Sequence, residues 1–196
     1  MPATTQKGQR IRQQIVEAAN TLFYRRGYNQ TSFSDIARAA GIPRGNFYYH
    51  FRSKDDILDA VIEFRLQSIR HMLAEWDETI ARPVDRLKRL VAILRNDEQD
   101  VLRYGCPMGS LNLELAKTRL ELQSRAAAMF ELFRVWLRRQ FEALGLGERA
   151  DALALHLLAR MQGIAMLGTV YRDADFLRRE AARLEHWIDA VEAGDE

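Results

Sequence analysis

The chain has 196 residues, 47% of them hydrophobic and 29% charged, and this balance excludes an intrinsically disordered chain. The formal charge of +2 is unevenly distributed, because residues 1–54 carry nine basic and two acidic side chains whereas the remainder carry 20 basic and 25 acidic ones. No run of about 20 apolar residues and no signal-peptide core is visible, and the single cysteine, Cys106, excludes an intrachain disulfide framework. The sequence therefore predicts a cytoplasmic globular protein, whose basic N-terminal quarter is either a surface for a polyanion or a plain solvated face.

The first predicted helix covers about residues 10–26. Apolar residues recur at helical spacing from Ile11 to Phe23. Gly27 follows two arginines at the place where a left-handed cap commonly ends a helix, so we expect the helix to stop there.

Two short helices are predicted next, with a tight turn between them. Ser32 and Asp35 have the spacing of a capping box, in which a hydroxyl and a carboxylate satisfy free amides at a helix start. Gly41 ends this helix. Pro43 then suits the first turn of another helix over residues 44–50, because its φ is fixed near the helical value.

The rest of the chain is also predicted to be helical. A long helix covers residues 54–80, and Pro83 interrupts it. Helical spacing continues from Leu87 to Leu102, from Leu111 to Phe141, and over about residues 148–171 and 175–192. Because no alternating strand pattern occurs, we expect an all-α protein with an N-terminal three-helix domain over residues 1–54 and a larger helical domain over residues 55–196.

The two short helices fit a helix-turn-helix, whose second helix enters the DNA major groove. Helical pairs with a glycine turn also occur as plain structure, but this second helix carries donors and aromatic groups and no acid. Arg44 can pair with guanine and Asn46 with adenine. Phe47 and Phe51, four residues apart, are expected to face inward. The side chains expected to reach phosphate oxygens are Tyr48, Tyr49, His50 and Lys54.

Residues Thr31 to Lys54 closely resemble the N-terminal signature of the TetR family of bacterial regulators. The resemblance extends by motif over about residues 10–60, and beyond them only by length and helix order. Pro43 and Arg44 depart from the family, which commonly has Ser or Thr and Lys there. By the resemblance, the phosphate-contacting positions are Thr31, Ser32, Tyr49, His50 and Lys54, and the positions near base edges are Arg44, Gly45, Asn46 and Tyr48.

The resemblance also implies how the protein works. It implies a homodimer that reads a palindromic operator in double-stranded DNA, usually as a repressor, and an activator role stays open. The last two long helices would form the dimer interface, although their apolar faces also suit an intrachain core. The preceding helices would enclose a small-molecule effector. Candidate ligand-binding residues are Trp76, Met129, Phe133, Trp136, His156, Met161, Gln162, Met166 and Tyr171.

Cys106 suggests a second way in which the protein could be regulated, through chemical modification of its thiol. If Pro107 is the first helical residue, the thiol lies at a helix N-terminus, where the helix dipole favours the reactive thiolate. The segment 105–111 also looks like a Gly-Cys-x-x-Gly stretch of some TetR-type regulators. A redox- or electrophile-sensing repressor is therefore the alternative to a ligand-responsive one, and a small residue in a helix–helix turn is the plain structural interpretation.

The sequence also bears on two further classes of function. An enzyme is disfavoured, because the four histidines are too far apart for a local metal motif and no phosphate-binding glycine loop follows a strand. We expect no catalytic residue, no metal and no cofactor. An architectural DNA-binding protein without sequence preference is the other alternative, and selection from random DNA would distinguish it.

Overall fold

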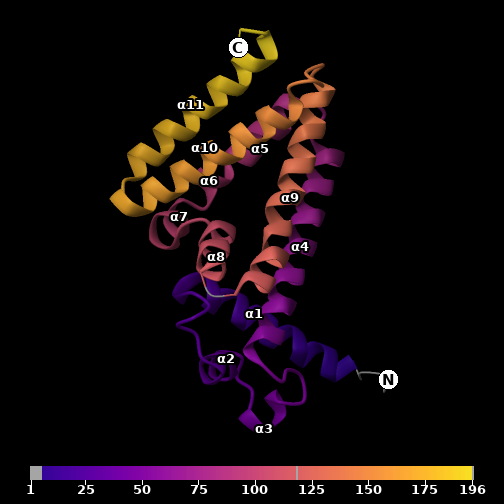
Figure 1. Ribbon diagram of the computed structural model, residues 1–196, viewed down its shortest axis with the longest axis vertical. Coiled ribbons are helices and arrows are strands. Elements are labelled where there is room, and N and C mark those ends of the chain that lie inside the picture. Colours follow the sequence, from indigo (N-terminus) through magenta and orange to yellow (C-terminus); the bar gives the residue numbers. More distant parts are fainter. Residues whose placement is uncertain (1–5, 118, 196) are drawn as a thin grey trace. The chain divides into compact units, whose positions relative to one another are not determined.

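The structure is a computed structural model that describes residues 6–117 and 119–195, with every side chain of these residues except that of Arg44. All regular elements in these residues are helices, which confirms the all-α prediction (Figure 1). They are α1 (Gln6–Arg26), α2 (Phe33–Ala39), α3 (Arg44–Phe47), α4 (Lys54–Thr79), α5 (Pro83–Val91), α6 (Ile93–Asn96), α7 (Glu98–Tyr104), α8 (Pro107–Ala116), α9 (Leu120–Ala143), α10 (Ala150–Tyr171) and α11 (Ala174–Ala193).

The helices pack as two compact units. Unit 1 comprises the chain up to Ser68 together with Ser110–Ala128, and unit 2 comprises Ile69–Gly109 together with the chain from Met129 onward. Three helices, α4, α8 and α9, contribute residues to both units. This division differs from the domain boundary expected after Lys54, because a stretch remote in sequence packs with the N-terminal helices.

Local signals fix the helix ends in unit 1. Gly27 has a φ of +85°, which confirms the expected left-handed cap after α1. At the start of α2, the Asp35 amide donates to Ser32 Oγ at 3.1 Å and the Ser32 amide donates to Asp35 Oδ2 at 3.1 Å. The predicted capping box is therefore present. The turn after α2 contains Gly41 with a φ of +67°.

The third helix is shorter than expected. Four residues, Arg44–Phe47, are α-helical and residues 48–50 form a turn, whereas the prediction extended the helix to His50. Pro43 precedes the helix, and its carbonyl accepts from the amides of Asn46 at 3.0 Å and Phe47 at 3.2 Å. The Phe51 amide still donates to the Phe47 carbonyl at 3.2 Å, so the chain keeps a helical path just beyond the helix.

In unit 2, the helical spacing from Leu87 to Leu102 is divided among α5, α6 and α7. The bends lie at Ala92 and Asp97, and Asp97 has φ −104° and ψ 21°, outside the helical region. Asparagine and aspartate, at positions 96 and 97, have a lower helix propensity than most residues, although the Asp97 side chain makes no capping hydrogen bond here. The pattern therefore predicted helical residues correctly but did not show where their axis bends.

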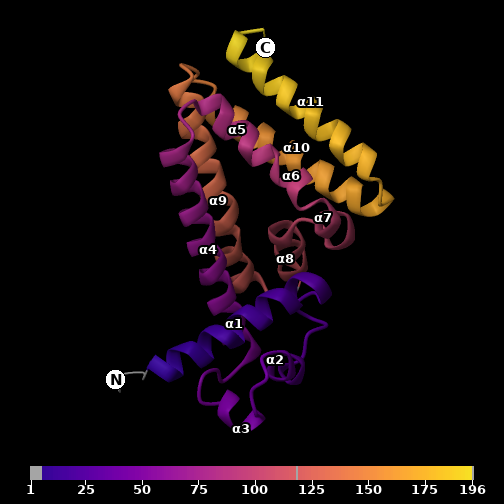
Figure 2. The ribbon, with the colours of Figure 1, turned by 180° about the vertical axis from the view of Figure 1, so that it is seen from behind.

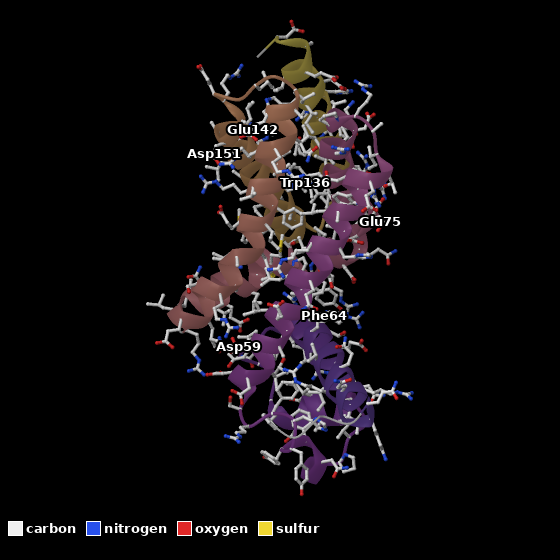
Figure 3. All side chains as sticks on the ribbon, turned by 90° about the vertical axis from the view of Figure 1, so that its right-hand side faces the viewer. Asp59, Phe64, Glu75, Trp136, Glu142 and Asp151 are labelled. Carbon is white, nitrogen blue, oxygen red and sulfur yellow. The ribbon has the colours of Figure 1, made fainter. Side chains whose placement is uncertain are left out.

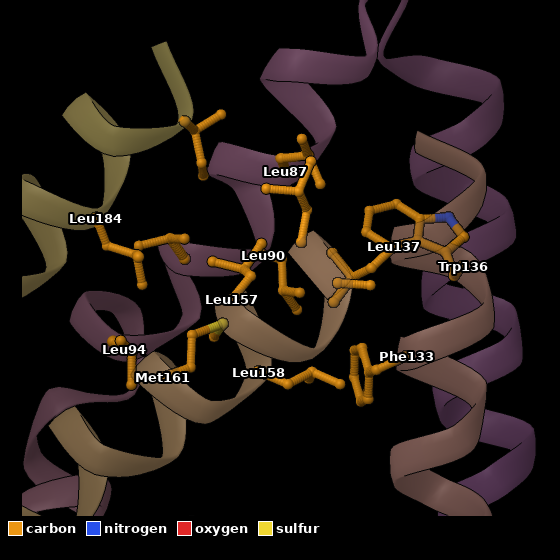
Figure 4. Packing of buried hydrophobic residues seen from close by; sticks show 14 of the residues in the cluster. Leu87, Leu90, Leu94, Phe133, Trp136, Leu137, Leu157, Leu158, Met161 and Leu184 are labelled. Carbon is orange, nitrogen blue, oxygen red and sulfur yellow. The ribbon is translucent and has the colours of Figure 1, made fainter. Parts of the chain in front are cut away.

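The core of unit 2 joins α5, α6 and α7 to the hairpin of α10 and α11, which lie side by side in Figures 1 and 2. Leu87, Leu157 and Leu184 are fully buried at its centre. In Figure 4, Phe133 on α9 and Leu158 on α10 point toward each other. Exposed ion pairs such as Arg178–Glu98 at 2.6 Å join α11 to its neighbours. Because such pairs contribute little, apolar packing holds this unit together.

Helix α10 is apolar on more than one side. Among the described helices it alone is long and apolar enough to cross a membrane, although no such run was predicted from the sequence. This is weak evidence, because the core helix of a globular protein passes the same test. One side of α10 carries nine buried residues, and the neighbours of this helix include α7, α9 and α11. The other side exposes large apolar groups: Leu155, Met166, Val170 and Tyr171. A helix that is apolar all round is normally covered on all sides.

Candidate nucleic-acid interface

Two buried aromatic rings anchor α3 and the residues that follow it, after the turn that contains Gly41. Phe47 is fully buried and Phe51 is 3% exposed, which confirms that both face inward. Phe33 on α2 meets the Phe47 ring edge-to-face, with ring centroids 4.6 Å apart. Arg12 on α1 lies over the Phe51 ring at 4.8 Å. Because these rings fix α3 against α2 and α1, the opposite side of α3 is rigidly presented to solvent.

The exposed side of α3 and of the turn after it, residues 48–50, carries four of the predicted contact residues. Gly45 and Asn46 are exposed, and Tyr49 is 87% exposed. Tyr48 is 61% exposed, and its ring stacks on Phe33 with centroids 5.3 Å apart. His50 is half-buried, and the side chain of Arg44 lies outside the described residues. Large exposed aromatic groups have a cost in water, so their presence here fits a surface that another molecule covers.

Thr31 and Ser32 lie at the start of α2 in different environments. The Thr31 side chain is buried, and its hydroxyl donates to the Gly27 carbonyl at 2.7 Å. Ser32 is exposed, and its hydrogen bonds to Asp35 are the main cause that holds the pKa of that carboxyl below its usual value. Ser32 is therefore accessible to a phosphate, whereas the Thr31 hydroxyl binds the turn of its own chain.

Lys54 is oriented toward the same turn. Its ammonium donates to the carbonyls of Tyr28 at 2.9 Å and Thr31 at 3.1 Å, and it lies over the Tyr28 ring at 4.1 Å. Burial is the main cause that lowers the pKa of this ammonium. The sequence predicted a phosphate contact for Lys54, and its position in this chain adds an intrachain role that the sequence did not indicate.

Three residues near this turn, Tyr28, Glu114 and Arg119, were not predicted from the sequence. The Tyr28 hydroxyl donates to Asp55 Oδ1, and Arg119 donates to the same carboxylate at 2.6 Å. Glu114 accepts from the Tyr28 amide at 2.8 Å and from the Asn29 amide at 2.7 Å. Arg119 and Glu114 are about 85 residues from the turn in sequence, so no local pattern signals them.

Alkaline titration is expected to reveal the buried phenol. Burial, followed by the hydrogen bond to Asp55, raises the pKa of Tyr28 from 10.0 to about 12. A raised pKa means that the fold favours the protonated phenol, so this stability is complete below pH 10 and is lost as the pH rises through 12. We expect the free energy of unfolding to fall less in Tyr28→Phe than in the parent chain between about pH 9 and about pH 11, measured by urea titration. Equal falls would contradict the assignment.

Five predicted ligand-binding residues are buried in unit 2, and all of them except Met129 belong to its core cluster. Trp76, Met129, Phe133, Trp136 and Met161 are all buried. The Trp76 and Trp136 rings meet edge-to-face with centroids 5.9 Å apart. Trp136 lies on the side of α9 next to α4, where its Nε1 donates to Asp77 Oδ1 at 3.0 Å (Figure 3).

The other four predicted ligand-binding residues lie on α10 away from that cluster. Gln162 is half-buried, while Met166 and Tyr171 are exposed. His156 is exposed and tilts over the Trp187 ring at 4.8 Å between centroids. The structure therefore does not bring all nine residues together. Within the described residues, no three His, Cys, Asp or Glu side chains are grouped to hold a metal ion.

Cys106 lies directly before α8, as the sequence predicted, since Pro107 is the first helical residue. Its thiol is half-buried, and the Gly109 amide donates to Sγ at 3.4 Å. This contact is an ordinary feature of a helix start. Nothing in the structure or in the similar proteins supports the alternative of a cysteine sensor.

Known proteins match this chain along most of its length. The model described as "Bacterial regulatory proteins, tetR family" matches residues 15–61, and "Transcriptional regulator LmrA/YxaF-like, C-terminal domain" matches residues 83–183. An HTH-type regulator in the lacX 3' region of Lactococcus lactis is 29% identical and covers 85% of this chain and 87% of its own. The HTH-type transcriptional repressor DhaR of a Mycobacterium species is 26% identical over 84% of this chain and 85% of its own.

Solved structures agree with the family models. A TetR transcriptional regulator from Chloroflexus aurantiacus superposes with a TM-score of 0.81 at 28% identity, covering 94% of this chain and 97% of its own. The two family models, these relatives and the fold all point to the same family, and they fit the surface of residues 44–50, called the recognition segment below. The chain belongs to the TetR family of bacterial transcriptional regulators, with a helix-turn-helix DNA-binding region and an LmrA/YxaF-like C-terminal domain.

Proposed function

We propose that this protein is a homodimeric repressor that binds a palindromic DNA operator in the cytoplasm and leaves it when a small molecule binds unit 2. The observation that carries the DNA part is the exposed surface of Gly45, Asn46, Tyr48 and Tyr49 on the buried Phe47 anchor. The name of DhaR describes that relative as a repressor, and we propose that the present chain also represses transcription.

The dimer part rests on the outer side of α10. Leu155, Met166 and Val170 are exposed there by 46%, 57% and 68%. Between them lie the exposed Ala159 and the half-buried Gly163, small residues that let a second helix approach closely. A second copy of the same helix, related by a two-fold axis, would cover this apolar side and set the spacing of two recognition segments.

The effector part rests on the aromatic cluster of unit 2. Trp76, Phe133 and Trp136 are buried together with the flexible Met161, and a site that opens among such side chains would suit an apolar or aromatic molecule. A ligand acts on the operator only through its different affinity for the DNA-bound and free conformations, and operator DNA must weaken ligand binding to the same extent. No catalytic step forms part of the proposal.

Two substitutions, one in α3 and one in the turn after it, test the DNA part. Asn46→Ala is expected to remove about 1–3 kcal/mol of discrimination at one base pair, because an amide side chain reads a base edge. Tyr49→Ala is expected to weaken binding to all duplexes without changing their ranking, because a phosphate contact carries no sequence information. Selection from random duplexes with the parent chain supplies the operator, and gel-shift titration of each variant then measures affinity.

The matched control for the second substitution is Tyr49→Phe, which removes only the hydroxyl. Lys54→Ala is a less specific probe of a phosphate contact, because it also removes the bonds to Tyr28 and Thr31. Unchanged affinity and unchanged ranking in both Asn46→Ala and Tyr49→Ala would overturn the assignment of this surface.

A further inference from the structure

The turn between α1 and α2 is bound by a carboxylate from a distant helix. Glu114 on α8 directs one carboxylate oxygen to the Tyr28 amide at 2.8 Å and the other to the Asn29 amide at 2.7 Å. Both groups belong to unit 1, and Figure 2 shows α8 beside the end of α1. Two successive amides that converge on one anion form a backbone nest, a strong and directional arrangement for a carboxylate.

The position of Glu114 has an electrostatic cost, which the surrounding groups offset. The C-terminal end of α1 carries the negative end of the helix dipole, so a carboxylate beside it is unfavourable by itself. Arg25 and Arg26 occupy the last turn of α1, and Lys54 interacts electrostatically with Glu114. The two amides and the Lys54 ammonium together stabilise the carboxylate at this place.

Gly27 fits the carboxylate closely. A Cβ atom at Gly27 would lie 3.1 and 3.2 Å from the two Glu114 oxygens, closer than ordinary contact. The φ of +85° at Gly27 also turns the next two amides away from the α1 axis. The glycine thus supplies both the backbone conformation and the space that the carboxylate needs.

The turn between α1 and α2, residues 27–32, is followed directly by α2, which packs against the recognition segment. Lys54 binds the Tyr28 and Thr31 carbonyls on the other side of the turn. Ser32, the next residue, caps α2, and Phe33 in α2 contacts both Phe47 and Tyr48. A displacement of the turn therefore moves Ser32 and the packing partner of the recognition segment.

From these contacts we infer that Glu114 is a positioning residue for operator binding, which acts through the Tyr28 and Asn29 amides on the placement of Ser32 and α3. The inference rests on the proposed operator recognition. When the carboxylate is removed, the turn samples several conformations, and the apparent dissociation constant rises in inverse proportion to the fraction that remains competent.

The test compares Glu114→Gln with Glu121→Gln in the full chain. Glu121 is an exposed carboxylate in the first turn of α9 and also belongs to unit 1. Loss of a negative charge by itself strengthens DNA binding or leaves it unchanged. We therefore expect Glu114→Gln to bind the duplex preferred by the parent chain at least about tenfold more weakly and to keep its affinity for random duplex. Glu121→Gln is expected to keep the parent affinity for both duplexes.

A second measurement separates positioning from general loss of structure. In ¹⁵N-labelled protein, the Tyr28 and Asn29 amides are expected to lose protection from hydrogen exchange in Glu114→Gln, while those of buried residues such as Ile57 keep theirs. Equal affinity of Glu114→Gln and the parent chain for the preferred duplex would overturn the inference, as would equal loss for preferred and random duplexes. Failure of the proposed function would instead show in the parent chain, as the absence of any preferred duplex.

Discussion

Val170→Glu is expected to convert the protein from a dimer to a monomer at micromolar concentration. Val170 is 68% exposed on the outer side of α10, within the apolar surface that the proposal assigns to a second copy. In a two-fold dimer each copy would bring one carboxylate into this surface, and an unpaired buried charge costs several kcal/mol. A total of about 4 kcal/mol raises the dimer dissociation constant about 1,000-fold.

The matched control for this substitution is Val135→Glu, the same change on α9 at a residue that is 41% exposed. Sedimentation velocity measures the oligomeric state of both variants and the parent chain. Operator affinity should fall with dimerisation, because a monomer contacts only one half-site. A Val170→Glu protein that stays as dimeric as Val135→Glu would contradict the assignment of this surface.

Phe47→Ala is expected to lower the free energy of unfolding of unit 1 by a large amount. The Phe47 ring is fully buried and contacts Phe33, and truncation of such a ring costs about 3–5 kcal/mol. This is a large part of the stability of an ordinary domain. Since Phe47 anchors α3 and the turn after it, which carry Asn46 and Tyr49, operator binding should be lost together with the local fold.

Two spectroscopic probes separate the unfolding of unit 2 from that of the whole protein. All three tryptophans, Trp76, Trp136 and Trp187, belong to unit 2, whereas far-UV ellipticity reports every helix. In urea titration we expect Phe47→Ala to lower the ellipticity midpoint, while the exposed Tyr49→Ala changes stability by no more than about 0.5 kcal/mol. Phe47→Ala with the parent midpoint by both probes would show that the ring is not the anchor of the segment.

Several features of the site follow from local sequence. The capping box at Ser32, the glycine caps at Gly27 and Gly41, and the inward pair Phe47 and Phe51 were all predicted, because each depends on residues at most four apart. The family resemblance rested on the same short stretch. These signals were sufficient to identify a helix-turn-helix before any contact was known.

Other predictions from the sequence could not anticipate the packing. The helical pattern gave no sign of the bends at Ala92 and Asp97, because both bent and straight helices keep the apolar spacing. Residues chosen as ligand contacts for their type were divided between the core, as for Trp136, and the outer side of α10, as for Met166. Amphipathic spacing does not tell which partner covers a second apolar side.

The sequence by itself determined that this protein is helical and where its recognition segment lies, since helix periodicity, caps and turn glycines act within a few residues. Only the tertiary structure decided that Lys54 points to the turn and that Glu114 and Arg119 support it. It also decided which side of α10 stays uncovered within the chain. Those contacts join groups up to 86 residues apart in sequence. They form only when whole helices pack together, and the local spacing of residues does not determine that packing.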